Sequence, residues 1–169
     1  AALKASKQGW ACVGHKLDYA HRAWIQPGHW LTSDMQKANE DAAALYASWE
    51  KDVQVEDYRL EDAEVVLPAY GISARICKSA VELLRAQGIK AGLIRPITVH
   101  PFPYASYDHI DYSKVKAVLD VEMSIPAQFV DDVAVSVKDR CPIETCLHAG
   151  GEIMGRGEVM DAVRKLLER

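Results

Sequence analysis

The chain has 169 residues, of which 49% are hydrophobic and 26% charged, a composition typical of one globular domain and unlike that of a disordered or collagen-like chain. It has 20 basic and 24 acidic side chains, so the net charge of −4 excludes the strong basic field typical of nucleic-acid-binding proteins. The sequence contains no apolar run long enough to span a membrane, and its four cysteines resemble no disulfide framework. We therefore expect a cytoplasmic protein.

The tryptophans all lie near the amino end, at Trp10, Trp24, Trp30 and Trp49. Residues 1–30 show no sustained hydrophobic period and read as an irregular arm. Because tryptophan is enriched where protein surfaces bury each other, Trp10, Trp24 and Trp30 are candidate interface residues. The alternative is that the arm covers its own domain. The first residue, Ala1, adds to the expectation that this is a piece of a longer polypeptide.

A helix is expected over about residues 32–50. The segment Thr32-Ser33-Asp34 offers short polar side chains that can cap a first turn. Apolar residues then recur at steps of three and four, at Met35, Ala38, Ala42, Leu45 and Trp49. A charged stretch follows this helix. We therefore predict that residues 1–57, which include both, form an inter-domain linker.

From residue 58 onward, short apolar runs alternate with amphipathic segments. Strands are expected near residues 65–69, 89–94, 115–121 and 143–147, and helices over 73–87, around 104–110, after Pro126 and over 158–167. This alternation is typical of parallel strands joined by right-handed crossovers. We therefore predict an α/β domain over residues 58–169, with three α/β/α layers and a mostly parallel sheet.

The turn at residues 69–75, between the first expected strand and helix, is a candidate anion site. Backbone N–H groups at a helix start can hold an anion, and Ser73 and Arg75 lie next to Gly71 in this turn. The turn contains neither a dinucleotide fingerprint nor a phosphate loop, and serine also serves as a simple helix cap. Arg75 stands where a nucleophile elbow needs its second glycine, so a hydrolase is not expected.

The cysteines at Cys141 and Cys146, with His148 nearby, form a second candidate cluster. Their spacing is wide for a zinc knuckle, and a fourth ligand is not evident. The three histidines of the amino-terminal arm have no carboxylates at helical spacing; they are His15, His21 and His29. We expect no metal site, and a thiol or metal enzyme remains a rival hypothesis.

Three prolines stiffen the loop that follows the second expected strand, residues 95–103. In an open α/β sheet, loops at this end of the strands carry function. Arg95, His100 and Phe102 are therefore candidate contacts to another domain or subunit. A purely structural stop is the alternative.

Three motifs carry a resemblance to one enzyme family: Ala-Tyr-Gly-Ile-Ser-Ala-Arg at 69–75, Gly-Leu-Ile-Arg-Pro-Ile-Thr at 92–98 and Pro-Phe-Pro at 101–103. They resemble the 2-oxoacid:ferredoxin oxidoreductases, in the carboxy-terminal part of the subunit that carries the pyrimidine-binding domain. The segment Val121-Glu122-Met123 and the pair Gly150-Gly151 also fit. The motifs look most like those of the branched-chain (2-oxoisovalerate) members.

The resemblance implies a transketolase C-terminal-like fold. In that family the whole complex decarboxylates a 2-oxoacid oxidatively to an acyl-CoA and reduces ferredoxin, using thiamine diphosphate, Mg²⁺, coenzyme A and iron–sulfur clusters. The thiamine cofactor sits between other domains. The resemblance therefore implies a non-catalytic assembly domain that holds no cofactor and is inactive alone.

The implied partners are the other domains of the same subunit and the thiamine-diphosphate-binding partner subunit. Pro68 in place of an aliphatic residue, and His100 in place of tryptophan, depart from the family pattern. The alternative function is a small α/β module that binds an anion, a phosphate or coenzyme A at residues 71–75.

Overall fold

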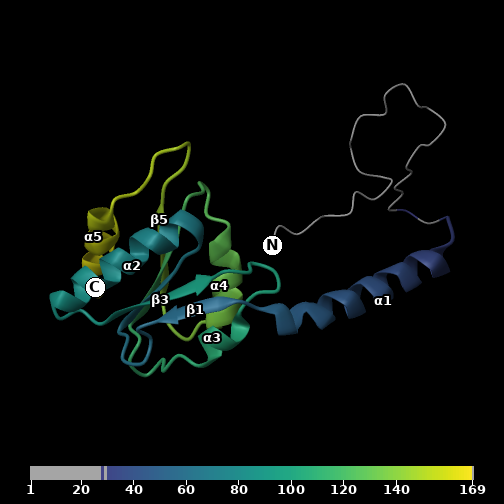
Figure 1. The fold of residues 1–169 in the computed structure, drawn as a ribbon, viewed down its shortest axis with the longest axis horizontal. Coiled ribbons are helices and arrows are strands. Elements are labelled where there is room, and N and C mark those ends of the chain that lie inside the picture. The colour runs from purple at the N-terminus through teal and green to yellow at the C-terminus, as the bar shows by residue number, and fades with distance from the viewer. Residues whose placement is uncertain (1–27, 29, 169) are drawn as a thin grey trace, which may run out of the picture. The chain divides into compact units, whose positions relative to one another are not determined.

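A computed structural model of the chain describes residue 28 and residues 30–168 (Figure 1). The candidate interface residues Trp10 and Trp24 lie outside the described residues. The chain divides into two compact units, residues 1–45 and residues 46–169. Within the described residues, no helix combines the length and the apolar character needed to cross a bilayer.

The predicted amino-terminal helix is present as α1 (Thr32–Ser48), and a short 3₁₀ helix, η1 (Trp49–Asp52), follows it. None of the residues of α1 is buried, although its sequence carries an apolar stripe. Leu45 in that stripe is 52% exposed, and Trp30 ahead of the helix is 95% exposed. The assignment of residues 1–57 to a linker remains a prediction.

Five strands form one sheet in the order β1-β3-β2-β4-β5. They are β1 (Val55–Tyr58), β2 (Val65–Pro68), β3 (Ala91–Pro96), β4 (Ala117–Glu122) and β5 (Ile143–Leu147). The strands β2 to β5 pair in parallel, as predicted. The edge strand β1 pairs antiparallel with β3, from Val55 opposite Pro96 to Tyr58 opposite Leu93. The sheet is therefore mixed but mostly parallel.

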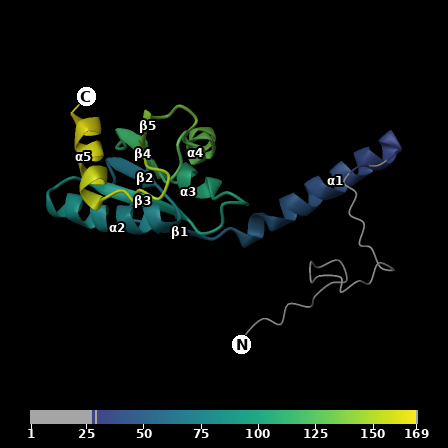
Figure 2. The ribbon, with the colours of Figure 1, turned by 90° about the horizontal axis from the view of Figure 1, so that it is seen from above.

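Helices cover both faces of this sheet, which confirms the predicted three-layer fold (Figures 1 and 2). They are α2 (Gly71–Ala86), α3 (Tyr104–Asp108), α4 (Phe129–Val137) and α5 (Arg156–Leu167). Side chains of α2 and α5 pack with one face of the sheet into a buried cluster. Side chains of α3 and α4 form a second buried cluster on the opposite face.

The central strand β2 and its helix α2 follow directly from the sequence. All four residues of β2 are buried, because a central parallel strand is covered on both faces. Pro68 has no N–H to donate and is the last residue of the strand, while the next amide, Ala69 N–H, donates to Ile94 O at 3.1 Å. Cys77, Val81 and Leu84 of α2 are fully buried at helical spacing.

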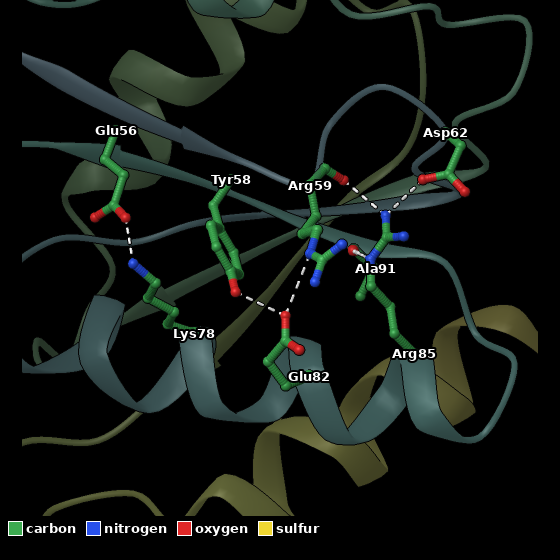
Figure 3. Close-up of polar contacts among 8 residues, drawn as sticks. All are labelled: Glu56, Tyr58, Arg59, Asp62, Lys78, Glu82, Arg85 and Ala91. Carbon is green, nitrogen blue, oxygen red and sulfur yellow. Dashed lines mark hydrogen bonds and ion pairs between the residues drawn. The ribbon is translucent and has the colours of Figure 1, made fainter.

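Polar contacts fasten the edge strand β1 and the turn after it to α2 (Figure 3). Lys78 of α2 pairs with Glu56 of β1, and the Tyr58 hydroxyl donates to Glu82 Oε1 at 2.7 Å. Arg85 reaches further and donates at 2.7 Å to each of three acceptors: Arg59 O, Asp62 Oδ1 and Ala91 O. The Arg85 side chain is only 19% exposed, so it bonds two backbone carbonyls in a partly dry setting.

Gly92 on β3 lets the turn after β1 approach the sheet closely. A Cβ at this position would lie 2.8 Å from Arg59 O and 2.9 Å from Leu60 Cδ2. Neither a backbone oxygen nor a packed side chain could move away without shifting the turn. The glycine of the Gly-Leu-Ile-Arg-Pro motif therefore has a packing role.

Candidate functional site

The strand order places a topological switch point between β2 and β4. The chain leaves β2 for β3 on one side and then crosses back to β4 on the other. In open α/β sheets, ligands bind at the carboxyl ends of the strands at such a point. We call this rim the carboxyl edge; it consists of residues 69–72, 97–104, 123–128 and 148–155.

A buried side chain of the protein occupies the anion position at this switch point. Glu122, the last residue of β4, is 1% exposed and directs its carboxylate at the first turn of α4. It accepts hydrogen bonds from Gln128 N–H at 2.9 Å, Phe129 N–H at 3.2 Å and Val130 N–H at 3.4 Å. A helix amino terminus attracts anions through its free N–H groups and its dipole. Here the ligand is the chain's own carboxylate.

The charge of Glu122 is stabilised in place. Burial raises the pKa of this carboxyl, but hydrogen bonds from the Ser124 hydroxyl and the α4 amides outweigh burial and hold the pKa below its usual value. Glu122 is therefore ionised at neutral pH. An external anion at α4 would have to displace a buried charge that already has its donors.

Aromatic rings fill the space beside this carboxylate. The Phe129 ring lies 5.1 Å from Tyr70 at the end of β2 and 5.8 Å from Phe102 in the loop after β3. The Phe102 ring also stacks on Tyr107 of α3 at 5.7 Å. Contacts of this kind hold the ends of β2, β3 and β4 together by packing.

The predicted turn at residues 71–75 lies on the carboxyl edge, where it starts α2. Gly71 takes a positive φ of 56°, and no side chain caps the helix. Ser73 is 2% exposed, so its hydroxyl faces the interior and not a ligand at the edge. Arg75 is exposed. The structure therefore brings together only part of the predicted anion site.

The predicted contact loop, residues 95–103, divides into paired, exposed and buried residues. Arg95 Nη1 binds Glu56 Oε2 at 3.0 Å and is thus engaged within the sheet. The exposed His100 ring stands edge-on to Tyr46 at 5.9 Å and to Trp49 at 5.8 Å. Phe102 is 6% exposed, so most of its ring is inaccessible to a partner.

The three cysteines that the structure describes lack the environment that a reactive thiol needs. Burial raises the pKa of Cys77, Cys141 and Cys146, which disfavours the nucleophilic thiolate. His148 Nε2 lies 3.3 Å from Glu158 Oε1. Within the described part of the chain, there is no group of three or more His, Cys, Asp or Glu side chains that could hold a metal ion.

Exposed apolar side chains gather at the carboxyl edge. They are Tyr70, Ile72, Ile97, Val99, Tyr104, Ile125 and Ile153, with exposures between 39% and 64%. Scattered exposed apolar residues are normal, whereas exposed apolar patches are typical of contact surfaces. Two hollows lie elsewhere: one is lined by residues 139–143 at the start of β5, and the other by Asp57 of β1 together with Ser106, His109 and Asp111 around the end of α3.

Residues 63–159 match the sequence family described as pyruvate:ferredoxin oxidoreductase core domain II. The chain belongs to this family. It is 41% identical over 119 residues to the ketoisovalerate oxidoreductase subunit VorB of Methanothermobacter marburgensis, covering 70% of this chain and 32% of that subunit. The chain thus spans about a third of the relative's length, and the resemblance to 2-oxoacid:ferredoxin oxidoreductase subunits is confirmed.

Two solved structures share the fold of this core domain II. One is 2-oxoglutarate:ferredoxin oxidoreductase from Magnetococcus marinus, with a TM-score of 0.69 and 17% identity over 82% of this chain and 24% of that chain. The other is a split-gene transketolase, with a TM-score of 0.56 and 21% identity over 68% of this chain and 41% of that chain. The predicted transketolase-like α/β fold is confirmed.

From the sequence, Glu122 was placed only within a family motif, and the binding of its carboxylate to the start of α4 was not predicted. A usable signal was present. A glutamate ends an otherwise apolar strand, and a proline and a new helix follow within a few residues. A carboxylate in that position can turn back to the helix start.

Proposed function

We propose that this core domain II is a non-catalytic assembly domain of a thiamine diphosphate-dependent 2-oxoacid:ferredoxin oxidoreductase subunit. The whole complex would convert a 2-oxoacid oxidatively to an acyl-CoA and pass the electrons to ferredoxin. Thiamine diphosphate, Mg²⁺, coenzyme A and iron–sulfur clusters would be held by other parts of the complex. The likeness to a ketoisovalerate oxidoreductase subunit favours a branched-chain 2-oxoacid as substrate. A cytoplasmic location is part of the same proposal.

The observation that carries this proposal is the apolar rim on the carboxyl edge. Ile97 is 54% exposed and Ile125 is 64% exposed, on loops that follow different strands. Burial of such apolar side chains against a partner contributes about 25 cal/mol of binding free energy for each Å² removed from water. A rim formed from four separate loops presents them together, as an interface core requires.

The interior of the switch point supports assembly over cofactor binding. The anion position holds Glu122, and the neighbouring space holds the rings of Phe129 and Phe102. A phosphate or coenzyme A at that point would have to displace a buried charge and packed aromatic area. Burying the carboxyl edge against protein requires neither change.

The proposed partners are the other domains of the same subunit and the thiamine-diphosphate-binding partner subunit. In this proposal the exposed His100, Val99 and Tyr104 meet them together with the isoleucines of the rim. The nearby Tyr46 and Trp49 rings pack on His100 and orient it. Trp30 and the arm before it remain proposed contacts of the same kind.

A matched pair of substitutions tests the rim in the assembled oxidoreductase. Ile125→Asp introduces a charge on the carboxyl edge, and Val135→Asp introduces the same charge on the outer face of α4. The two side chains are 64% and 63% exposed, so their effects on the isolated chain should match. We expect Ile125→Asp to weaken subunit association about tenfold or more, because a buried, unpaired charge costs at least about 1.4 kcal/mol.

Sedimentation velocity of the complex measures this association, and circular dichroism of the 169-residue chain checks its fold. Val135→Asp is expected to assemble as the unchanged protein does. The proposal is contradicted if Ile125→Asp and an added Ile97→Asp both assemble with unchanged affinity.

A further inference from the structure

Two carboxyl groups lie buried side by side on one face of β4. Successive side chains of a strand point to opposite faces, so Asp120 and Glu122 share a face. Val118 on that face belongs to the cluster formed with α3 and α4, whereas Leu119 and Val121 belong to the opposite one. Asp120 is fully buried and Glu122 is 1% exposed.

The two carboxyl groups differ in their donors. Glu122 receives its hydrogen bonds from the Ser124 hydroxyl and from the amides at the start of α4. Neither oxygen of Asp120 receives a hydrogen bond from any described donor. The Tyr107 hydroxyl on α3 is also buried without a described partner. Leaving a carboxylate buried and unpaired would cost several kcal/mol, so an ionised Asp120 is disfavoured here.

The charges around Asp120 favour its neutral form. The titratable groups that it influences, or that influence it, are Glu122 on β4, Tyr107 on α3, Cys77 on α2 and Cys146 on β5. All of them are acids, and no described lysine, arginine or histidine is among the groups that shift Asp120. Burial first, and then the neighbouring Glu122, raise the pKa of Asp120 to about 8.

We propose that Asp120 and Glu122 bind one proton between them, which resides on Asp120 and is donated as an O–H···O hydrogen bond to the Glu122 carboxylate. Two carboxylates can only accept hydrogen bonds, which is why the ionised pair forms none with each other. Protonation turns Asp120 into a donor and leaves a single negative charge at the start of α4. That charge is the one the helix amino terminus stabilises.

This proton site does not depend on the assembly role proposed above. It predicts how the stability of the chain changes with pH. Unfolded Asp120 releases its proton near pH 4, whereas folded Asp120 keeps it up to about pH 8. Between these values the folded state holds the extra proton, so stability falls as pH rises and levels off once Asp120 is ionised in both states.

Comparison of unchanged protein with Asp120→Asn tests the site. The asparagine amide can still donate to Glu122 but cannot ionise. For the unchanged chain, the contribution of Asp120 lowers the folding equilibrium constant up to about tenfold per pH unit between pH 5 and 8. We expect urea unfolding of Asp120→Asn to lack this component, and an exposed control in the same region, Asp131→Asn, to keep it.

A direct observation of the proton keeps the test independent of mutant folding. Carbon-13 NMR of the unchanged chain, labelled at the aspartate carboxyl carbons, should show one aspartate that is protonated at pH 7 and titrates near pH 8. Its resonance should be missing in Asp120→Asn and present in Asp131→Asn. Finding every aspartate ionised at pH 7, or finding the same pH dependence of stability in Asp120→Asn, would overturn the proposal.

Discussion

Replacement of Glu122 by alanine is expected to lower the free energy of unfolding by about 4 kcal/mol, since it removes a buried, fully bonded carboxylate. Three amides of the first turn of α4 would lose their acceptor in a site that is 1% exposed. The Ser124 hydroxyl would lose the same partner. Such a loss is a large part of the 5–15 kcal/mol that usually stabilises a domain of about this size. Urea denaturation of the 169-residue chain measures it.

The control for this change is Glu152→Ala, which removes an exposed glutamate from the same rim. We expect a change of no more than about 0.5 kcal/mol, as for most surface substitutions. A Glu122 variant that unfolds at the same urea concentration as Glu152→Ala would show that the carboxylate does not hold α4. The pH dependence has a defined sign. Because the pKa of Glu122 is lowered in the folded chain, its contribution is present above the unfolded value of 4.5 and is lost as pH falls.

Replacement of Arg85 by alanine should lower the free energy of unfolding by about 3 kcal/mol, because two backbone carbonyls lose a charged donor. These carbonyls, Arg59 O and Ala91 O, lie at the turn after β1 and at the start of β3. The Asp62 carboxylate loses its partner as well, and its lowered pKa, caused first by the hydrogen bond from Arg85, should return toward the usual value. Thermal or urea unfolding of the chain tests this result.

Arg75→Ala is the matched control, because it removes an exposed arginine from the same helix α2. Its unfolding should stay within about 0.5 kcal/mol of the unchanged chain. Arg85→Lys should fall between the two, since a single ammonium group cannot reproduce the planar fork of donors. Equal stabilities of Arg85→Ala and Arg75→Ala would contradict the role given to Arg85 (Figure 3).

The layers of the fold could be predicted because their signal is local. A fully apolar run such as residues 65–67, followed by a helix with Cys77, Val81 and Leu84 on one face, fits only a buried strand and its covering helix. Pro68 is the last residue of that strand, where its missing N–H interrupts no ladder. Gly88, with a φ of +84°, stands just after α2, where a helix end favours glycine.

The edge strand β1 could not be predicted from local sequence, because its pairing depends on residues far away in the chain. The strand β1 is short and polar, and its antiparallel pairing with β3 depends on contacts such as Glu56 with Lys78 across the fold. The apolar stripe of α1 shows the same limit, because periodicity predicts a helix but not what covers it.

The position of the predicted contact loops follows from the fold, but the orientation of their side chains does not, and the site itself stays a prediction. The loops after β2 and β3 do lie on the carboxyl edge, which topology alone requires. Which side chains face outward could not be inferred: Ser73 and Phe102 are buried, Arg95 is paired, and the neighbouring Ile97 and Val99 are exposed. The burial of Asp120 and Glu122 could not be predicted, because carboxylates on a strand are usually exposed. The helix that buries them comes from a later part of the sequence.

Hydrogen–deuterium exchange of the complex proposed above, compared with the 169-residue chain alone, tests the central claim most directly. If the carboxyl edge is the assembly surface, backbone amides of residues 97–104 and 123–128 exchange more slowly in the complex, while those on the outer face of α4 around Val135 do not change. Unchanged exchange in both loops, with protection only around Val135 and the outer helices, would contradict the account.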